Sequence, residues 1–304
     1  MPELFQPVDL DEALAFMAEH PGITMPIAGG TDVMIDMRIG RAMPEWLVDL
    51  RPLQTLKGLA FEGDAVRIGA LTRLRTLELN GELARRAPAV VEAARVLGSV
   101  QIRTMATLGG NLCHATPSAE MPPPLLVHDA VAEVASRDGS RTLPLADVFA
   151  GPGATTLESG ELLTAVTLRA TESGSGSCYL RQTVRWSMDL AGVGVAASIE
   201  AAAGAVTAAR VALGAVAPVP LLVPEAGAAV IGSPLTTESA VEAGARAAAA
   251  CSPITDARGT AEYRRQVVAV LVARALRIAW LRANGEWPAG LPAPINGVLS
   301  GATS

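Results

Sequence analysis

The chain of 304 residues is long enough for two domains, and half of its residues are hydrophobic although only 3% are aromatic. A formal net charge of -6 argues against a nucleic-acid-binding surface. No apolar run approaches the roughly 20 residues that a membrane-spanning helix needs, and the N-terminus lacks the charged and apolar regions of a signal peptide. We therefore expect a cytoplasmic protein.

The first fifty residues predict short β–α–β units. Residues 9–19 have the period of an amphipathic helix, with Asp9 as N-cap and Glu12 three positions later. Further elements are expected as a strand at 25–28, a helix at 32–38 and a strand at 46–50.

The pattern changes after residue 53. A hairpin is expected from strands at 56–59 and 65–68. One helix is expected at 71–79 with Thr72 as its cap, and a longer one at 82–97 despite the presence of Pro88. The remaining strands of this part are expected at 130–135, 141–145 and 162–169.

A polar segment rich in Gly and Ser, at 172–177, is the expected domain boundary. Beyond it, strands at 193–200 and 206–216 are expected to form a hairpin across Ala203-Gly204. Helices are expected at 239–250 and 260–284, the second capped by Thr260. The tail from Gly285 is rich in Pro and Gly.

Cysteine and histidine placement predicts no metal site. The three cysteines, Cys113, Cys178 and Cys251, lie too far apart for a paired-cysteine zinc motif, so buried thiols are the expectation. Iron–sulfur clusters usually need four cysteines, which makes a cluster held by this chain alone unexpected. The three histidines are equally scattered.

Two segments about eighty residues apart each contain a pair of glycines followed by short polar residues. The first is Pro26-Ile27-Ala28-Gly29-Gly30-Thr31-Asp32 and the second is Ala106-Thr107-Leu108-Gly109-Gly110-Asn111. Glycine bares backbone N–H groups that can bind an anion, so two such loops, each expected after an apolar strand, point to a diphosphate ligand. The alternative is that each pair is only a tight turn, since neither matches a Rossmann or P-loop motif. Arg103 is either a phosphate partner or a surface or structural arginine.

In this order and spacing, the two segments resemble the flavin-binding medium subunit of the molybdenum hydroxylases, the family of xanthine dehydrogenase and carbon monoxide dehydrogenase. The resemblance extends over nearly the whole chain. It includes Gln101-Ile102-Arg103, Pro117-Ser118-Ala119-Glu120, Glu161-Leu162-Leu163, the stretch 179–191 and the stretch 256–265.

The resemblance implies an α+β fold. A two-lobed FAD-binding domain of the vanillyl-alcohol-oxidase (PCMH) type is expected at 1–172, with lobes at about 1–52 and 53–172. A smaller α+β domain like the C-terminal domain of the carbon monoxide dehydrogenase flavoprotein is expected at 178–286, followed by a tail at 287–304.

The resemblance also implies which residues hold FAD. Backbone amides of Pro26, Ile27, Ala28, Gly29, Gly30, Thr31, Asp32 and Val33 are expected to wrap the diphosphate, and Thr107, Leu108, Gly109, Gly110 and Asn111 to complete the cradle. Further contacts are expected from Leu97, Glu120, Leu163, Arg181 and Leu190.

Several of these positions carry specific expectations. Glu120 stands where the family usually has Asp, and is expected to bind hydroxyls of the ribose or ribityl chain. Arg181 stands where relatives often carry Lys, near the flavin, with a surface charge on the sheet as the alternative. His114 is expected to pack within its loop. Asp256, Arg258 and Tyr263 are expected to be structural, fixing the entry to the last helix.

As a member of this family, the chain would be the FAD-carrying subunit of a heterotrimer, in a dimer of heterotrimers. The molybdenum-pterin cofactor would lie on a large subunit and two [2Fe–2S] clusters on a small one. Electrons would pass through FAD to an acceptor such as NAD⁺, a quinone, a cytochrome or oxygen, so no residue of this chain is expected to be catalytic. The alternatives are a self-sufficient FAD oxidoreductase of the same fold and a flavin-free scaffold subunit.

Overall fold

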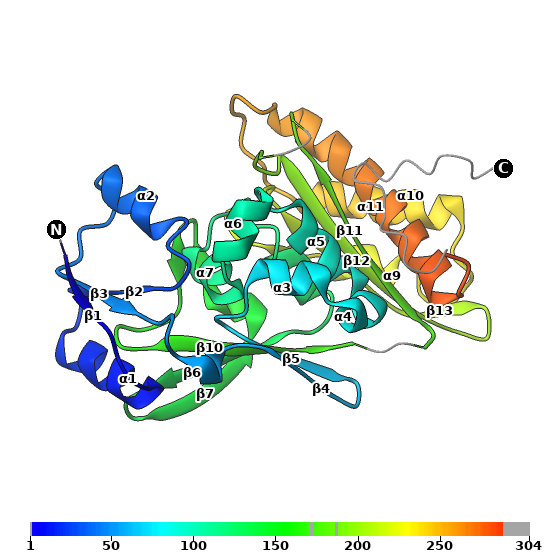
Figure 1. The fold of residues 1–304 in the computed structure, drawn as a ribbon. Coiled ribbons are helices and arrows are strands. Elements are labelled where there is room, and N and C mark those ends of the chain that lie inside the picture. Colours follow the sequence, from blue (N-terminus) through cyan, green and yellow to red (C-terminus); the bar gives the residue numbers. More distant parts are fainter. Residues whose placement is uncertain (1, 171–172, 186–187, 288–304) are drawn as a thin grey trace.

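The computed structural model describes residues 2–170, 173–185 and 188–287. Three sheets of three or more strands follow one another along the chain, and helices fill the space between the second and third of them (Figure 1). No helix among the described residues is long and apolar enough to span a membrane.

The N-terminal unit is a parallel sheet of strand order β1-β3-β2, as the β–α–β pattern predicts. Its elements are β1 (Glu3–Phe5), α1 (Leu10–Glu19), β2 (Thr24–Ile27), α2 (Val33–Arg38) and β3 (Trp46–Asp49). The side chain of Asp9 accepts a hydrogen bond from the Glu12 amide at 2.9 Å, which caps α1. Buried residues of α1, among them Leu14 and Met17, form a small core with Val48.

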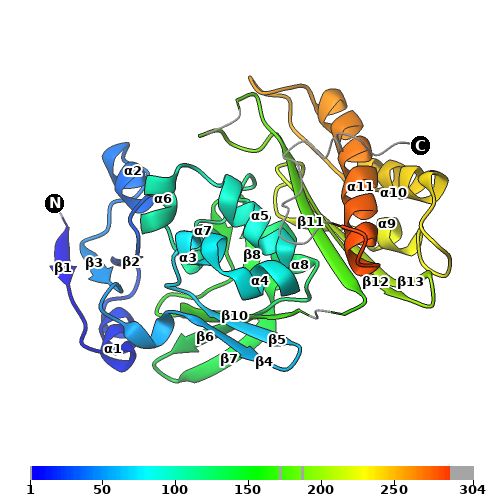
Figure 2. The same ribbon diagram turned by 45° about the vertical axis from the view of Figure 1, so that its right-hand side comes forward.

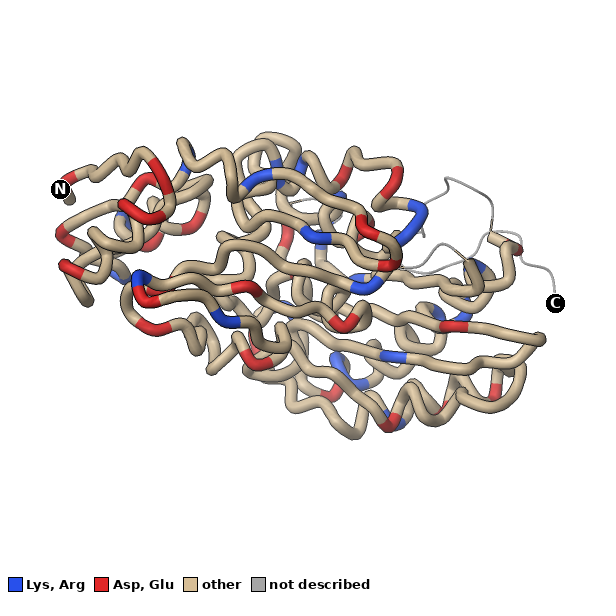
Figure 3. The backbone as a smooth tube through the Cα atoms, turned by 90° about the horizontal axis from the view of Figure 1, so that it is seen from below, with Lys and Arg blue, Asp and Glu red and all other residues tan. Residues whose placement is uncertain are grey.

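The middle unit contains an antiparallel sheet of order β4-β5-β10-β6-β7. Its strands are β4 (Leu59–Glu62), β5 (Ala65–Gly69), β6 (Val131–Ser136), β7 (Gly139–Pro144) and β10 (Leu162–Arg169), and short elements are η1 (Gln54–Leu56), η2 (Leu145–Val148), β8 (Phe149–Gly151) and β9 (Ala154–Thr155). Basic and acidic residues are interspersed along the backbone shown in Figure 3. Ion pairs such as Arg67–Glu133 at 2.8 Å and Arg141–Glu161 at 2.7 Å each reach past one intervening strand of this sheet.

Six short helices cover the inner face of the five-stranded sheet. They are α3 (Leu74–Leu79), α4 (Gly81–Arg86), α5 (Pro88–Val96), α6 (Val100–Met105), α7 (Leu108–His114) and α8 (Pro122–Leu126). Their apolar side chains share one core with the sheet. This middle core also includes Tyr179 and Ala196 from the third sheet.

The C-terminal unit is an antiparallel sheet of order β11-β12-β13-β14 with three helices on its outer face (Figure 2). Its elements are β11 (Ser175–Gln182), β12 (Val193–Ala202), β13 (Ala205–Gly214), β14 (Leu221–Leu222), α9 (Pro224–Ala228), α10 (Thr237–Ala250) and α11 (Ala261–Ala283). Successive residues of β11 point to opposite faces, so Tyr179 joins the middle core whereas Cys178 and Leu180 join the outer core. The predicted hairpin across Ala203-Gly204 and the predicted Thr260 cap of α11 are confirmed.

The prediction of a single helix at 82–97 is wrong, because two helices occupy this stretch. Pro88 divides it into α4 and α5, because proline lacks the N–H that a continuing helix needs and favours the first turn of a new one. Thr72 is not a helix cap either, since its hydroxyl bonds the N–H and the carbonyl of Gly58, both at 2.9 Å. The helix α3 begins only at Leu74, after Arg73.

Two further boundaries differ from prediction. The first strand of the hairpin runs from Leu59 to Glu62 rather than over 56–59, because Leu56 ends a 3₁₀ turn and is buried in the N-terminal core. The polar segment at 172–177, the expected domain boundary, overlaps a strand, because β11 begins at Ser175, which pairs with Glu200. Residue 172 lies outside the described residues.

Buried polar groups join the middle layer to the third sheet. Glu92 of α5 accepts from the Tyr179 amide at 2.9 Å and from Arg282 of α11 at 2.5 Å.

His128 lies beside this junction, with Nε2 3.0 Å from the Ser177 hydroxyl and Nδ1 2.8 Å from the Arg169 carbonyl. Burial lowers the pKa of His128 to about 4.

This lowered pKa predicts acid sensitivity. Between pH 6.5 and 4 the unfolded chain binds a proton at residue 128 that the folded chain does not, so the free energy of unfolding should fall as the pH drops through this range. We expect the loss to be on the order of 2 kcal/mol. Urea unfolding at pH 7.5 and 4.5 measures it, and a His128→Gln variant, which cannot titrate, should show a smaller drop. An identical drop in both proteins would contradict the assignment.

Candidate functional site

The first glycine pair lies in an open loop between β2 and α2. None of the backbone N–H groups of residues 29–33 donates a hydrogen bond within the described part of the chain. Gly30 has φ of +70°, a conformation that glycine adopts without strain. Five consecutive N–H groups are therefore available to an external acceptor, as the anion-binding interpretation of this segment requires.

The second glycine pair does not lie in the open loop that the sequence predicts. It follows the helix α6 rather than a strand, and Gly109 and Gly110 form the first turn of α7. The N–H groups of residues 108–111 donate to the carbonyls of Thr72, Ala70 and Thr107 and to the Thr107 hydroxyl. The expectation of bared amides is wrong here, because the helix and its N-cap already use them.

The two segments nevertheless meet. A Cβ on Gly29 would overlap the carbonyl oxygen of Met105, the last residue of α6, so only glycine permits this contact between the two main chains. His114 at the end of α7 lies 3.1 Å from the Asp36 carboxylate of α2 and braces the same junction. His114 thus contacts α2 and not only its own loop, within which it was expected to pack.

The two glycines of the second pair have different surroundings. A Cβ on Gly109 would lie 2.8 Å from the Cβ of Ala70, so Gly109 allows α7 to pack on the sheet. A Cβ on Gly110 would meet only the Thr107 hydroxyl, at 3.0 Å, and Gly110 is exposed. Next to it, the Oδ1 atom of Asn111 is buried and has no hydrogen-bond partner among the described residues. An unmet acceptor beside an open backbone surface is suited to a ligand with donor groups.

Glu120 and Arg181 form a buried ion pair, with Oε1 and Nη1 2.8 Å apart. Their side chains are 7% and 1% exposed, so the surface-charge alternative for Arg181 is wrong. The same Nη1 donates to the Asp189 carbonyl at 3.3 Å, while Nε has no partner in the described chain. Burial raises the pKa of Glu120 to about 7, although the Arg181 guanidinium opposes the rise.

Arg103 is structural. Its guanidinium bonds the buried carboxylate of Glu78 at 2.7 Å and the carbonyl of Leu97 at 2.9 Å. The apolar residues expected at the cofactor lie in different environments. Leu97 and Leu163 are buried in the middle core, whereas Leu190 is 47% exposed.

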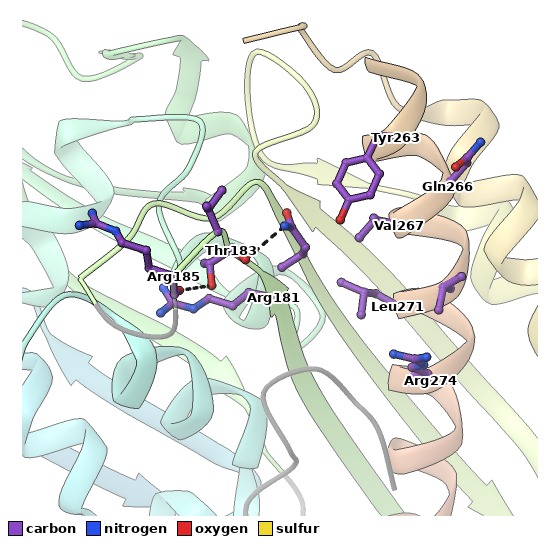
Figure 4. A pocket seen from close by; sticks show the side chains of 11 residues that line it. Arg181, Thr183, Arg185, Tyr263, Gln266, Val267, Leu271 and Arg274 are labelled. Carbon is purple, nitrogen blue, oxygen red and sulfur yellow. Dashed lines mark hydrogen bonds between the residues drawn. The ribbon is translucent and has the colours of Figure 1, made fainter. Parts of the chain in front are cut away.

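A cavity of about 550 Å³ lies between the end of β11 and α11 (Figure 4). Tyr263, Val267 and Leu271 line it from α11, and Arg181 lines it from β11. The segment after β11 is held by Asp189, whose carboxylate accepts from the amides of Val184 and Arg185 at 2.9 and 2.8 Å. No carboxylate is among the described lining residues, which include Arg185 and Arg274.

Sequence pattern alone does not reveal the main-chain partner of the first loop. Met105 carries no motif, and its carbonyl matters only because the fold places it against Gly29. Among the described residues, no group of three or more His, Cys, Asp or Glu side chains is arranged to hold a metal ion.

Comparison with known proteins gives two family matches. Residues 1–169 match the FAD binding domain in molybdopterin dehydrogenase, and residues 178–279 match the CO dehydrogenase flavoprotein C-terminal domain. The chain is 33% identical to the carbon monoxide dehydrogenase medium chain of Afipia carboxidovorans, over 92% of this chain and 96% of that one. It is 30% identical to the glyceraldehyde dehydrogenase medium chain of Sulfolobus acidocaldarius, over 88% and 94% of the two chains.

A solved structure of reconstituted CO dehydrogenase from Oligotropha carboxidovorans has the same fold. It matches with a TM-score of 0.90 and 32% identity, over 93% of this chain and 98% of that one. The expected α+β fold class and the expected FAD-binding domain are confirmed by these matches.

The Gly29 contact predicts a severe effect of one methyl group. Gly29→Ala should lower the free energy of unfolding of the flavin-free protein by about 2 kcal/mol, because the Met105 carbonyl cannot move without displacing α6. Urea unfolding measures the loss. Gly81→Ala, at a helical glycine with no atom near the added methyl group, is the control and should cost nothing. Equal stability of the Gly29 variant and the natural protein would refute the contact.

The buried pair predicts strong coupling between Glu120 and Arg181. Either Glu120→Leu or Arg181→Met should cost about 3 kcal/mol, because each leaves a buried polar partner unpaired, and the double variant should cost clearly less than the sum. The exposed pair of Arg246 and Glu242, also 2.8 Å apart, provides a control cycle with coupling below about 1 kcal/mol. Additive costs at residues 120 and 181 would contradict the pairing.

Proposed function

The chain belongs to the family of FAD-binding medium subunits of the molybdenum hydroxylases, and we propose that the loop at 28–33 and the start of α7 hold its FAD. The observation that carries this proposal is the run of five unbonded N–H groups at residues 29–33, set against the α6–α7 junction. A diphosphate is doubly anionic and offers oxygens that can accept from such a row of amides.

The other residues of the site fit the cofactor in different ways. Exposed Gly110 leaves room for the ligand against the backbone, and the unpartnered Oδ1 of Asn111 can accept from a hydroxyl or amine of FAD. Because the amides of residues 108–111 are engaged, we assign the contribution of this segment to its side chains and its open surface. Pro26, Ile27 and Ala28 then serve to lead β2 into the loop.

Glu120 and Arg181 are proposed to act together. Arg181 binds one carboxylate oxygen of Glu120, and the second oxygen remains for a ribose or ribityl hydroxyl. Arg181 keeps its Nε donor for the flavin side of the site. Exposed Leu190 can cover a ring face, whereas buried Leu97 and Leu163 can contribute only the edges of their side chains.

The chemistry that bound FAD supplies is electron transfer, from [2Fe–2S] clusters of a small subunit to an external acceptor such as NAD⁺, a quinone, a cytochrome or oxygen. The chain itself binds and orients the cofactor. We propose that it works in the cytoplasm within a heterotrimer whose large subunit carries the molybdenum-pterin cofactor, and that two heterotrimers associate. The proposed domain limits remain 1–172 and 178–286.

The histidines favour this passive role over a self-sufficient flavoenzyme, which needs an acid or base at the flavin. His20 is bonded to the Phe16 carbonyl, His114 to Asp36 and His128 to Ser177. All three side chains are thus engaged in the packing of the chain, and we assign none of them to catalysis.

The open surface at Gly110 gives a test that separates FAD binding from folding. Gly110→Val should leave the urea unfolding of the flavin-free protein within about 1 kcal/mol of the natural value, because only the Thr107 hydroxyl is near. The flavin content of the purified protein, measured by visible absorption and by chromatography of the released flavin, should fall at least tenfold.

Gly110→Ala is the matched control and should keep more FAD than Gly110→Val. The measurement is made on the chain alone and on the chain coexpressed with large and small subunits of the same enzyme. If the natural chain carries no FAD in either form, the proposal is wrong and a scaffold role takes its place.

A further inference from the structure

One arginine of the C-terminal helix bonds the main chain at two neighbouring strand ends of the third sheet. Arg264 lies in the first turns of α11, and its side chain is 4% exposed. Its Nη1 donates to the carbonyls of Gly192 and Ala215, at 3.0 and 3.1 Å, and its Nη2 donates to the Asp256 carboxylate at 2.5 Å.

The two carbonyls belong to neighbouring strands. Gly192 immediately precedes β12, and Ala215 immediately follows β13, where the antiparallel ladder of these strands has ended. Backbone carbonyls beyond a ladder need another donor when they are buried, and a guanidinium can serve two of them at once. Arg264 therefore fixes the separation of the two strand ends.

Each of these strand ends is linked through a neighbouring segment to Glu120 or to Arg181. Ala215 has φ of +64°, which is strained for alanine, and its N–H donates to the Pro117 carbonyl at 2.7 Å. Pro117 begins the segment that carries Glu120. On the other side, Gly192 follows the segment of Asp189, whose carbonyl accepts from Arg181.

The paired residues thus receive support from both strand ends. Arg181 is held by the Asp189 carbonyl and binds Glu120, and the segment of Glu120 is held by Ala215. Gly214 adds close packing, because a Cβ there would lie 3.0 Å from Pro123. Without the Arg264 guanidinium, the carbonyls of Gly192 and Ala215 would lose their common donor.

Asp256 orients this guanidinium. Its Oδ1 also accepts from the Arg258 amide at 2.8 Å, and its backbone pairs with Gly259 in a small bridge. Asp256 therefore holds Arg264 from a turn that is itself closed by two hydrogen bonds. The structural role expected for Asp256 is the orientation of Arg264.

We propose that Arg264 is a positioning residue for the FAD site. On one side it bonds Ala215, whose N–H donates to Pro117 in the segment of Glu120. On the other side it bonds Gly192, which follows the Asp189 segment that holds Arg181. This inference rests on the proposed function in assigning FAD to the site. The structural coupling between Arg264 and residues 117–120 is argued from hydrogen bonds and does not depend on FAD. It can therefore be tested separately.

The test compares Arg264→Met with Arg282→Met by amide hydrogen exchange in the flavin-free protein. Arg282 lies near the other end of α11 and also makes buried contacts across to the middle layer, with Glu92 and the Ser177 carbonyl. Both variants should lower stability. Only Arg264→Met should raise exchange at least tenfold at the amides of Gly192, Ala215 and Ala119.

Affinity for FAD gives the second measurement. Arg264→Met should weaken FAD binding at least tenfold at a temperature where the variant is folded, Arg264→Lys should recover part of the affinity, and Arg282→Met should change it less than threefold. An exchange increase that stops at Gly192 and Ala215, or one that is equal in both methionine variants, overturns the inference. Failure of the natural protein to bind FAD overturns the proposed function instead, and the exchange at Ala119 still decides the coupling.

Discussion

The close approach of two main chains, at Gly29 and Met105, is the constraint on which the candidate site depends. No side chain separates the loop after β2 from the end of α6, so the first loop is fixed against the helices of the middle layer. Its five amides at residues 29–33 have no hydrogen-bond acceptor within the described chain. The anion binding proposed for the loop therefore depends on tertiary packing as much as on its glycines.

A second set of constraints runs through buried charges that join the C-terminal unit to the middle layer. The pairs Glu120–Arg181 and Glu92–Arg282 each link a helix or loop of the middle layer to β11 or α11. Buried pairs contribute little net stability relative to apolar packing, but they are costly to break singly. They therefore fix how the third sheet sits on the helices, and Arg264 extends this control to the ends of β12 and β13.

Local signals carried most of the fold that could be predicted. Caps and periodicity identified α1 and α11, and a two-residue turn identified the β12–β13 hairpin. The first glycine loop was also evident, and the family resemblance is confirmed by the matches to both domains. The features of the site that local sequence pattern could not predict depend on contacts between residues distant in sequence. The engagement of the amides of α7 requires Ala70 and Thr72, and the burial of Arg181 requires Glu120, 61 positions away.

We propose that the amides of residues 29–33 bind the diphosphate of FAD. Calorimetric titration of the flavin-stripped protein with FAD and with FMN tests it, because FMN has the same ring system but no diphosphate. We expect one FAD per chain and FMN binding at least about 100-fold weaker, since FMN presents one phosphate rather than two to the row of amides. Equal affinity for the two flavins would contradict the claim.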